Sequence, residues 1–186
     1  MHFNIKGCIA PLSENLHLFP KLRLLRLEDI TWNEHNLLHL FKNLKSIPCL
    51  ETLSLTGTQQ SDPEEEVRGS LEEEVFQASF THQALLSLSL SERSLTSAVA
   101  RLLGQLIPKM SALKELQIRG RDERILQDGE VEALFGEFKQ RLPLQRLAFH
   151  KFSMKGRLDH LINSLQFFPH LQWTYAHVNK IGRAHV

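Results

Sequence analysis

The sequence predicts an α/β fold: a horseshoe-shaped solenoid with a parallel, concave β-sheet and convex α-helices. Two observations predict it. The apolar pattern L-x-x-L-x-L, or a variant of it, begins at six positions, namely Leu22, Leu50, Leu85, Leu113, Leu144 and Leu171. The starts are separated by 28, 35, 28, 31 and 27 residues, and apolar stripes at helical spacing lie between them. Such a period indicates stacked units, each burying its apolar face against the next.

The segment 20–47 shows how one unit is built. Leu25 and Leu27 alternate with Arg26 and Glu28, so we expect a strand that buries the two leucines and directs the charged residues to its opposite face. A stripe at helical spacing follows, made of Leu37, Leu40, Phe41, Leu44 and Ile47. Pro48 ends that helix, because proline has no N–H and disfavours a helical residue before it. A strand and a full helix in each unit are typical of the longer leucine-rich repeats.

Three later segments carry the same helical stripe, and each ends at a proline. The stripes are Val99, Leu102, Leu103, Leu106 and Ile107 before Pro108; Val131, Leu134, Phe135, Phe138 and Leu142 before Pro143; and Leu158, Leu161, Ile162, Leu165 and Phe168 before Pro169. We therefore expect a helix-to-strand junction at each of these prolines, with the stripe buried.

A longer duplication lies beneath the short repeats. Residues 3–22 match residues 152–171 at a shift of 149, with eight of twenty positions identical, which favours growth by copying blocks of about five repeats. The last six residues, IGRAHV, resemble one translation frame of a short-read sequencing adapter. We therefore predict two segments: 1–179, an array of about six repeats that is truncated at both ends, and 180–186, a sequencing-adapter artefact to be left out of fold reasoning.

Composition favours a reducing compartment. Only two cysteines are present, no N-x-S/T sequon occurs, and no cysteine-rich cap is visible, so we predict a cytoplasmic protein. Cys49 adjoins Leu50 and is expected to be a small buried apolar residue. No run of 18 apolar residues occurs, which predicts no membrane span. The net charge is +1, but the segment 61–75 alone carries −6; it is interpreted as a solvated loop, with an acidic knob for a basic partner as the alternative.

No pattern predicts catalysis. The phosphate-binding and nucleophile-elbow motifs are absent, and Glu72, Glu73 and Glu74 are consecutive, so they diverge around a helix. His35 and His39 have a spacing that suits a metal but lack a third ligand. We interpret them as exposed helix histidines. The prediction is therefore a protein that is not an enzyme and has no catalytic residue, metal or cofactor.

The candidate site is the exposed face of the predicted sheet, on which we expect a protein partner or ligand to bind. Its candidate residues are Arg26, Glu28, Thr52, Ser54, Ser87, Ser89, Glu115, Gln117, Arg119, Arg146, His150, Trp173 and Tyr175. Leu24, Thr56, Ser91, Ala148 and His177 are predicted to face the same way. Six strands about 4.8 Å apart would span about 25 Å, and Arg, Trp and Tyr are frequent in binding hot spots. An ordinary solvated face is an equal alternative, whereas interleaved acids disfavour a nucleic-acid partner.

Two stretches carry a resemblance to a known family. FPKLRLLRLEDITWNEHNLLHLFKNLKSIPCLETLSL and DGEVEALFGEFKQRLPLQRLAF resemble the ribonuclease-inhibitor-like class of leucine-rich repeats, and in particular the C-terminal arrays of Nod-like receptors. The resemblance implies the ligand-sensing or autoinhibitory region of an intracellular innate-immune receptor, with a nucleotide-binding domain upstream. The alternative is a ribonuclease-inhibitor-like or F-box-type adaptor. The family's Asn or Cys after each strand is replaced here by Ile30, Thr58, Arg93, Arg121 and Phe152.

Overall fold

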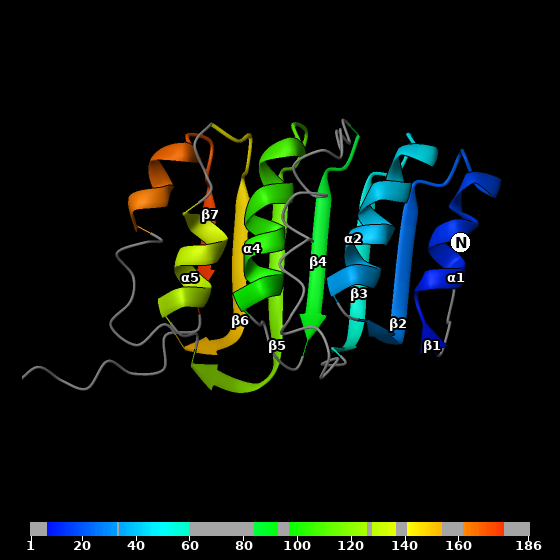
Figure 1. Ribbon diagram of the computed structural model, residues 1–186. Helices are drawn as coiled ribbons and strands as arrows, with labels where there is room; N and C mark the ends of the chain where they lie inside the picture. The colour runs from blue at the N-terminus through cyan, green and yellow to red at the C-terminus, as the bar shows by residue number, and fades with distance from the viewer. Residues whose placement is uncertain are drawn as a thin grey trace, which may run out of the picture.

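The computed structural model describes residues 7–32, 34–59, 84–92, 97–125, 128–136, 141–153 and 162–176. These residues form an α/β fold with one seven-stranded parallel sheet, in which the spatial order of the strands equals their order in the chain (Figure 1). The strands are β1 (Gly7–Cys8), β2 (Leu24–Trp32), β3 (Thr52–Gln59), β4 (Ser87–Glu92), β5 (Glu115–Ile125), β6 (Arg146–Ser153) and β7 (Trp173–Ala176).

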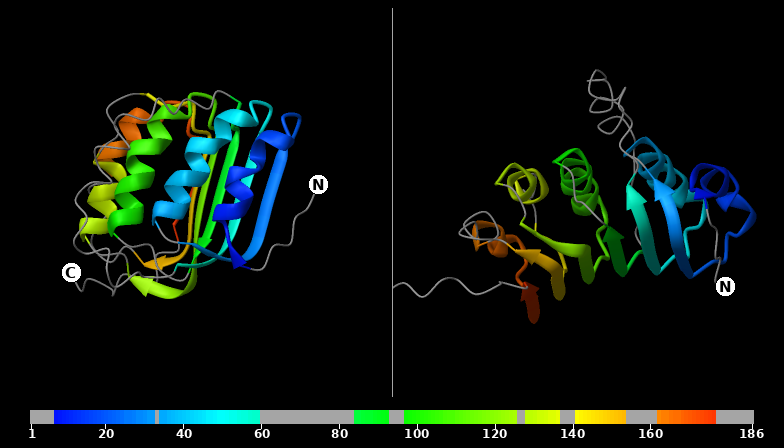
Figure 2. Two further views of the ribbon diagram at one scale, coloured as in Figure 1. Left: turned by 45° about the vertical axis from the view of Figure 1, so that its right-hand side comes forward. Right: turned by 90° about the horizontal axis from the view of Figure 1, so that it is seen from below.

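The helices form a second layer on one face of this sheet, and the opposite face carries no described helix (Figure 2). The helices are α1 (Ala10–Glu14), α2 (Glu34–Asn43), α4 (Ser97–Leu106) and α5 (Asp128–Phe135). Short 3₁₀ turns lead toward four of the strands: η1 (Leu16–Leu18), η2 (Leu44–Ser46), η4 (Ile107–Lys109) and η5 (Leu165–Phe167). A parallel strand pair needs such a crossover connection, because the chain must return to the starting edge of the sheet.

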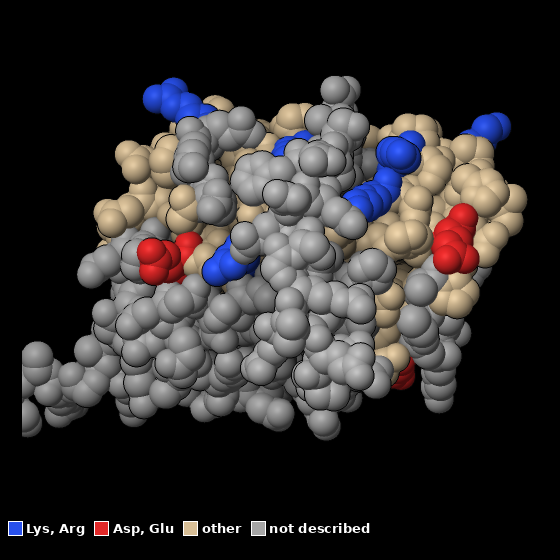
Figure 3. Space-filling model, in the orientation of Figure 1, with Lys and Arg blue, Asp and Glu red and all other residues tan. Residues whose placement is uncertain are grey.

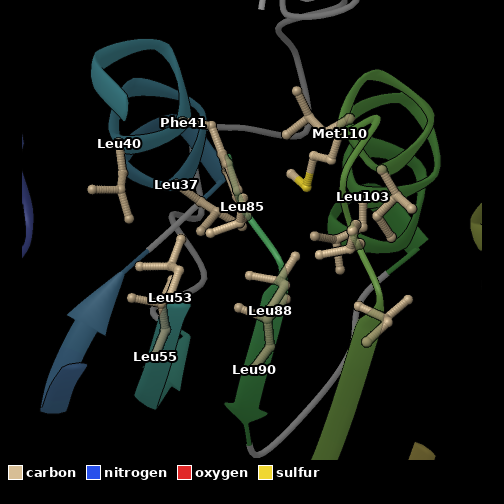
Figure 4. Packing of buried hydrophobic residues seen from close by; sticks show 14 of the residues in the cluster. Leu37, Leu40, Phe41, Leu53, Leu55, Leu85, Leu88, Leu90, Leu103 and Met110 are labelled. Carbon is tan, nitrogen blue, oxygen red and sulfur yellow. The ribbon is translucent and has the colours of Figure 1, made fainter. Parts of the chain in front are cut away.

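The core lies between the two layers and is built from the repeated leucines. Leu25, Leu53, Leu88, Leu116 and Leu147 occupy paired positions on β2 to β6, and each has 0% exposure. The helical stripes before Pro48 and Pro108 are also buried, as the spacing predicts. Figure 4 shows Leu88 and Leu90 of β4 in one cluster with Phe41 of α2 and Leu103 of α4.

Four of the described junctions from helix to strand use the same pair of backbone hydrogen bonds. After α2, Ile47 donates to the Leu44 carbonyl at 3.0 Å and Leu50 donates to the Ile47 carbonyl at 3.0 Å. Equivalent pairs follow η1, η4 and η5, through Phe19 and Leu22, Met110 and Leu113, and Phe168 and Leu171. The repeated sequence therefore produces a repeated local structure that satisfies the carbonyls at each helix end.

Helices α4 and α5 approach closely because of one glycine. A Cβ added at Gly104 would lie 2.5 Å from the Ala133 carbonyl oxygen and 2.8 Å from that of Leu134. Both distances are shorter than real contacts of a Cβ atom. Glycine is therefore required at position 104 for this helix pair to reach its observed separation.

Two expectations about the core are wrong. Ile162 and Leu165, predicted to be buried, are 55% and 37% exposed, since no described helix packs over them. Cys49, predicted to be buried, is exposed, because it lies in the turn between η2 and β3 while Ile47 and Leu50 fill the core beside it. Helix α4 ends at Leu106, just before Pro108, as the spacing predicts, and Pro108 lies in η4, where a proline is tolerated at the first turn.

Several expectations concern residues outside the described ranges. They are the acidic segment 61–75, the segment 180–186, the side chains of Val131, Phe138, Leu158 and Leu161, and the position of His177. Within the described ranges, none of the helices has the length and apolar character needed to cross a membrane.

Candidate functional site

The predicted site residues other than Glu28 lie in rows across the helix-free face of the sheet, and Glu28 falls in the irregular stretch of β2, where it has no register partner. Alternate strand residues point to opposite faces, so burial of the leucine rows directs the intervening residues away from the helices. One row runs through Leu24, Thr52, Ser87, Glu115, Arg146 and Trp173. The next runs through Arg26, Ser54, Ser89, Gln117, Ala148 and Tyr175. Thr56, Ser91, Arg119 and His150 form the third. The structure thus brings residues that are far apart in the sequence onto one surface.

The middle of this face carries short polar side chains. Thr52 and Ser54 of β3 lie beside Ser87 and Ser89 of β4, and all four are half-buried. A hydroxyl both donates and accepts hydrogen bonds, and these side chains are short. The central strands therefore present a shallow strip that can approach a partner backbone closely.

An ion pair crosses β5 and β6 in the first row. Arg146 Nε contacts Glu115 Oε1, and the two residues are direct neighbours in the strand register. The Arg146 side chain is 59% exposed, whereas that of Glu115 is 19% exposed. Exposed pairs contribute little to stability because water screens them. The pair therefore serves mainly to orient a guanidinium at the surface.

Arg119 has different surroundings. It is exposed, and its register neighbours are Ser91 on β4 and His150 on β6. Neither neighbour is an acid, and the carboxylate of Glu115 two rows away already contacts Arg146. Arg119 is therefore the cation of this face that is best placed to meet a carboxylate of a partner.

Ala148 differs from the predicted exposed surface, and two further predicted positions have side chains that the structure does not describe. Ala148, expected to face solvent, has 0% exposure. It does lie in the second row, but its methyl group is short and is flanked by the longer Arg146 and His150 on its own strand. For Trp173 and Tyr175 the structure places the backbone in β7, paired with β6, and their side chains are outside the description.

A bulge in β2 was not foreseen from the sequence. Leu27 pairs with Leu55, but Ile30 pairs with Gly57, so β2 has one residue more than β3 over this stretch. Asp29 takes up the difference with a φ of 55°, a conformation that Asp tolerates better than most residues. A Cβ on Gly57 would lie 2.0 Å from the Ile30 carbonyl oxygen. Gly57 was the one feature of the sequence that could have indicated the bulge. The bulge changes the path of β2 just after Glu28.

The helix layer contains one serine–histidine contact. Ser13 Oγ lies 2.9 Å from His39 Nδ1, and Asn43 Nδ2 donates to the same nitrogen at 3.2 Å. Because an amide nitrogen is only a donor, Nδ1 accepts and the Ser13 hydroxyl also donates. Ser13 is 1% exposed, so no substrate reaches its oxygen. The contact joins α1 to α2, and half-buried His39 is not the exposed residue that was expected.

The described residues offer no group of three His, Cys, Asp or Glu side chains that could hold a metal ion. The side chain of His35 lies outside the description. Comparison of the chain with protein-family models, curated proteins and solved structures gave no match. The functional argument therefore depends on the sheet face itself.

Proposed function

We propose that the chain is part of a leucine-rich repeat solenoid of horseshoe shape and that the helix-free sheet face is its protein-recognition surface. The parent protein is an intracellular, cytoplasmic receptor of the Nod-like type, in which this region senses a ligand or holds the receptor inactive. One observation carries the proposal. Along β2 to β6 the buried position is leucine in every strand, while the next position, on the opposite side of the strand, changes from Arg26 to Ser54, Ser89, Gln117 and Ala148.

Such an arrangement suits recognition because it separates folding from binding. The constant leucines stabilise a rigid sheet, and the exposed residues can vary without cost to the core. The exposed residues combine a shallow hydroxyl strip with Arg119 and Arg146, and arginine is a residue type enriched in binding hot spots. The adaptor alternative uses the same surface and differs in the domain that accompanies it.

The family assignment is tested by the full transcript. The messenger RNA would be amplified outward in both directions from the codons of residues 20–150. A P-loop nucleotide-binding domain upstream and further repeats downstream support the receptor. An F-box upstream supports the adaptor instead, and a catalytic domain that uses this sheet face as its substrate site would contradict both.

The binding face is tested by matched charge reversals. The wild-type chain would be cross-linked to partners in extract from its source cells, and each captured protein would then be produced and its affinity measured. Arg119→Glu and Arg146→Glu should each weaken the binding at least about tenfold, which corresponds to about 1.4 kcal/mol. Arg101→Glu, on the exposed surface of α4, is the control and should bind normally. Equal affinity of all three variants would contradict the proposed face.

A further inference from the structure

Among the described residues, those at the edge where helices end and strands begin are strongly basic. The described junctions 16–23, 44–51, 84–86, 107–114, 141–145 and 165–172 contain one carboxylate, that of Glu51. They contain six Lys and Arg residues, which we call the basic edge: Lys21, Arg23, Lys45, Lys109, Lys114 and Arg141. These junctions thus have a net charge of +5 in a chain whose total is +1.

The cations of the basic edge are accessible. Five are exposed and Lys109 is half-buried. The single acid of these junctions, Glu51, lies 3.7 Å from Arg23, and the two side chains are 43% and 76% exposed. On the side of the molecule that Figure 3 shows, most of the visible Lys and Arg side chains lie toward the upper edge, whereas the visible Asp and Glu side chains lie lower.

A backbone ladder holds this edge in a line. Glu51 N–H donates to the Arg23 carbonyl and Leu86 N–H to the Glu51 carbonyl, each at 2.8 Å. The series continues through Lys114 and Gln145 to Gln172, at 2.8 to 2.9 Å. Because neighbouring strands are about 4.8 Å apart, the basic edge spans about 19 Å from β2 to β6. The ladder therefore fixes the backbone of two of these cations, Arg23 and Lys114.

The helix dipole explains only part of this charge. A cation at a helix C-terminus is favourable, which accounts for Lys45 in η2 and Lys109 in η4. Lys21, Arg23 and Lys114 lie beyond the turns, at the starts of strands. Folding alone gives no reason for positive charge at these three positions, so their common sign points to a ligand.

An exposed leucine accompanies the cations. Leu18 in η1 is 61% exposed, and this turn lies on the same edge. A polyanion such as a nucleic acid would match the charge but leave this leucine in water. A bilayer with acidic headgroups offers negative charge at its surface and an apolar layer just below it.

We propose that the basic edge docks on the surface of an anionic phospholipid membrane, with Leu18 entering the headgroup region. The site is separate from the sheet face of the proposed function and does not depend on it. Clusters of four to eight Lys and Arg residues are typical of such surfaces. Docking by this edge leaves the sheet face open to a protein partner, because the two surfaces lie at right angles.

The test is sedimentation of the whole chain with vesicles of phosphatidylcholine, with and without phosphatidylserine. We expect binding only when phosphatidylserine is present. It should weaken as salt rises from about 0.1 to about 1 M, since the Debye length falls from about 10 to about 3 Å. The triple variant Lys21→Gln, Lys45→Gln, Lys114→Gln should lose at least about tenfold in affinity. Leu18→Ser should lose about fivefold.

The control is a second triple variant, Arg26→Gln, Arg101→Gln, Arg119→Gln, which removes the same charge elsewhere and should bind vesicles normally. Equal loss in both triple variants would show that only total charge matters and would overturn the proposal. So would a wild-type chain that ignores phosphatidylserine, or one that binds heparin or duplex DNA equally well and is indifferent to Leu18→Ser. Partner capture by the sheet face is a separate measurement, so either proposal can fail alone.

Discussion

Two copies of the same sequence, 3–22 and 152–171, have different environments in the folded chain. Leu16 of the first copy is 1% exposed, whereas its counterpart Leu165 is 37% exposed. Ser13 is 1% exposed, whereas Ile162 at the equivalent position is 55% exposed. The more apolar residue of this second pair is thus the one that meets solvent.

The neighbouring helix accounts for the difference. Helix α2 packs against α1, η2 packs against η1, and His39 of α2 contacts Ser13. No described helix follows η5 to pack in the same way. In a stacked protein each unit is completed by the next, so the burial of a side chain depends on its neighbour as much as on its own unit.

The largest expected effect tests this difference directly. Leu16→Ala should lower the free energy of unfolding by about 2–5 kcal/mol, because it leaves a cavity between α1 and α2. Leu165→Ala removes the same atoms from a partly exposed position and should cost under about 1.5 kcal/mol. Urea denaturation of both variants measures the two values, and equal costs would contradict the burial described here.

A second substitution tests the contact between α4 and α5, in which both helices are in place. Gly104→Ala should destabilise the chain by about 1–3 kcal/mol, because the added methyl group meets backbone carbonyls of α5. In a solvent-exposed helix the same substitution would stabilise by about 1 kcal/mol, so the sign of the change is informative. Thermal unfolding followed by circular dichroism gives the sign. A raised melting temperature would mean that α4 and α5 are farther apart than described.

A smaller loss of stability is expected for Ser13, the polar residue of the pair Ser13 and Ile162. Ser13→Ala removes the hydroxyl that donates to His39 and should cost about 0.5–1.5 kcal/mol. Ile162→Ser at the equivalent position should cost less than about 1 kcal/mol, since more than half of that side chain is already in solvent. The two values come from denaturation curves at one pH, and a larger cost for Ile162→Ser would show that a further segment covers it.

The smallest effect is expected on the sheet face. Arg146→Gln breaks the ion pair with Glu115 but should change stability by no more than about 1 kcal/mol, because the guanidinium is largely exposed. The same variant should weaken capture of a partner. Differential scanning calorimetry gives the first quantity. A loss of stability close to that of Leu16→Ala would assign the pair to the core instead of the binding surface.

Several structural details could not be read from the pattern. Cys49 was expected to be buried because it adjoins Leu50, but a turn places it outside while its neighbours point inward. Ala148 was expected in solvent because of its strand parity, but it is too short to reach past Arg146 and His150. The bulge at Asp29 arises from the fit between β2 and β3, which a single strand does not contain.

The sequence by itself determined the elements and their register. The spacing of Leu25 and Leu27, repeated at Leu53 and Leu55 and again at Leu88 and Leu90, specifies which strand face is buried, since a shift of one residue would expose every leucine. Only the tertiary structure decided which groups surround a given residue. Backbone carbonyls of α5 lie close to Gly104, His39 contacts Ser13, and Ile162 is exposed to solvent. The reason is physical: periodicity is a property of one segment, whereas burial and close approach belong to pairs of segments.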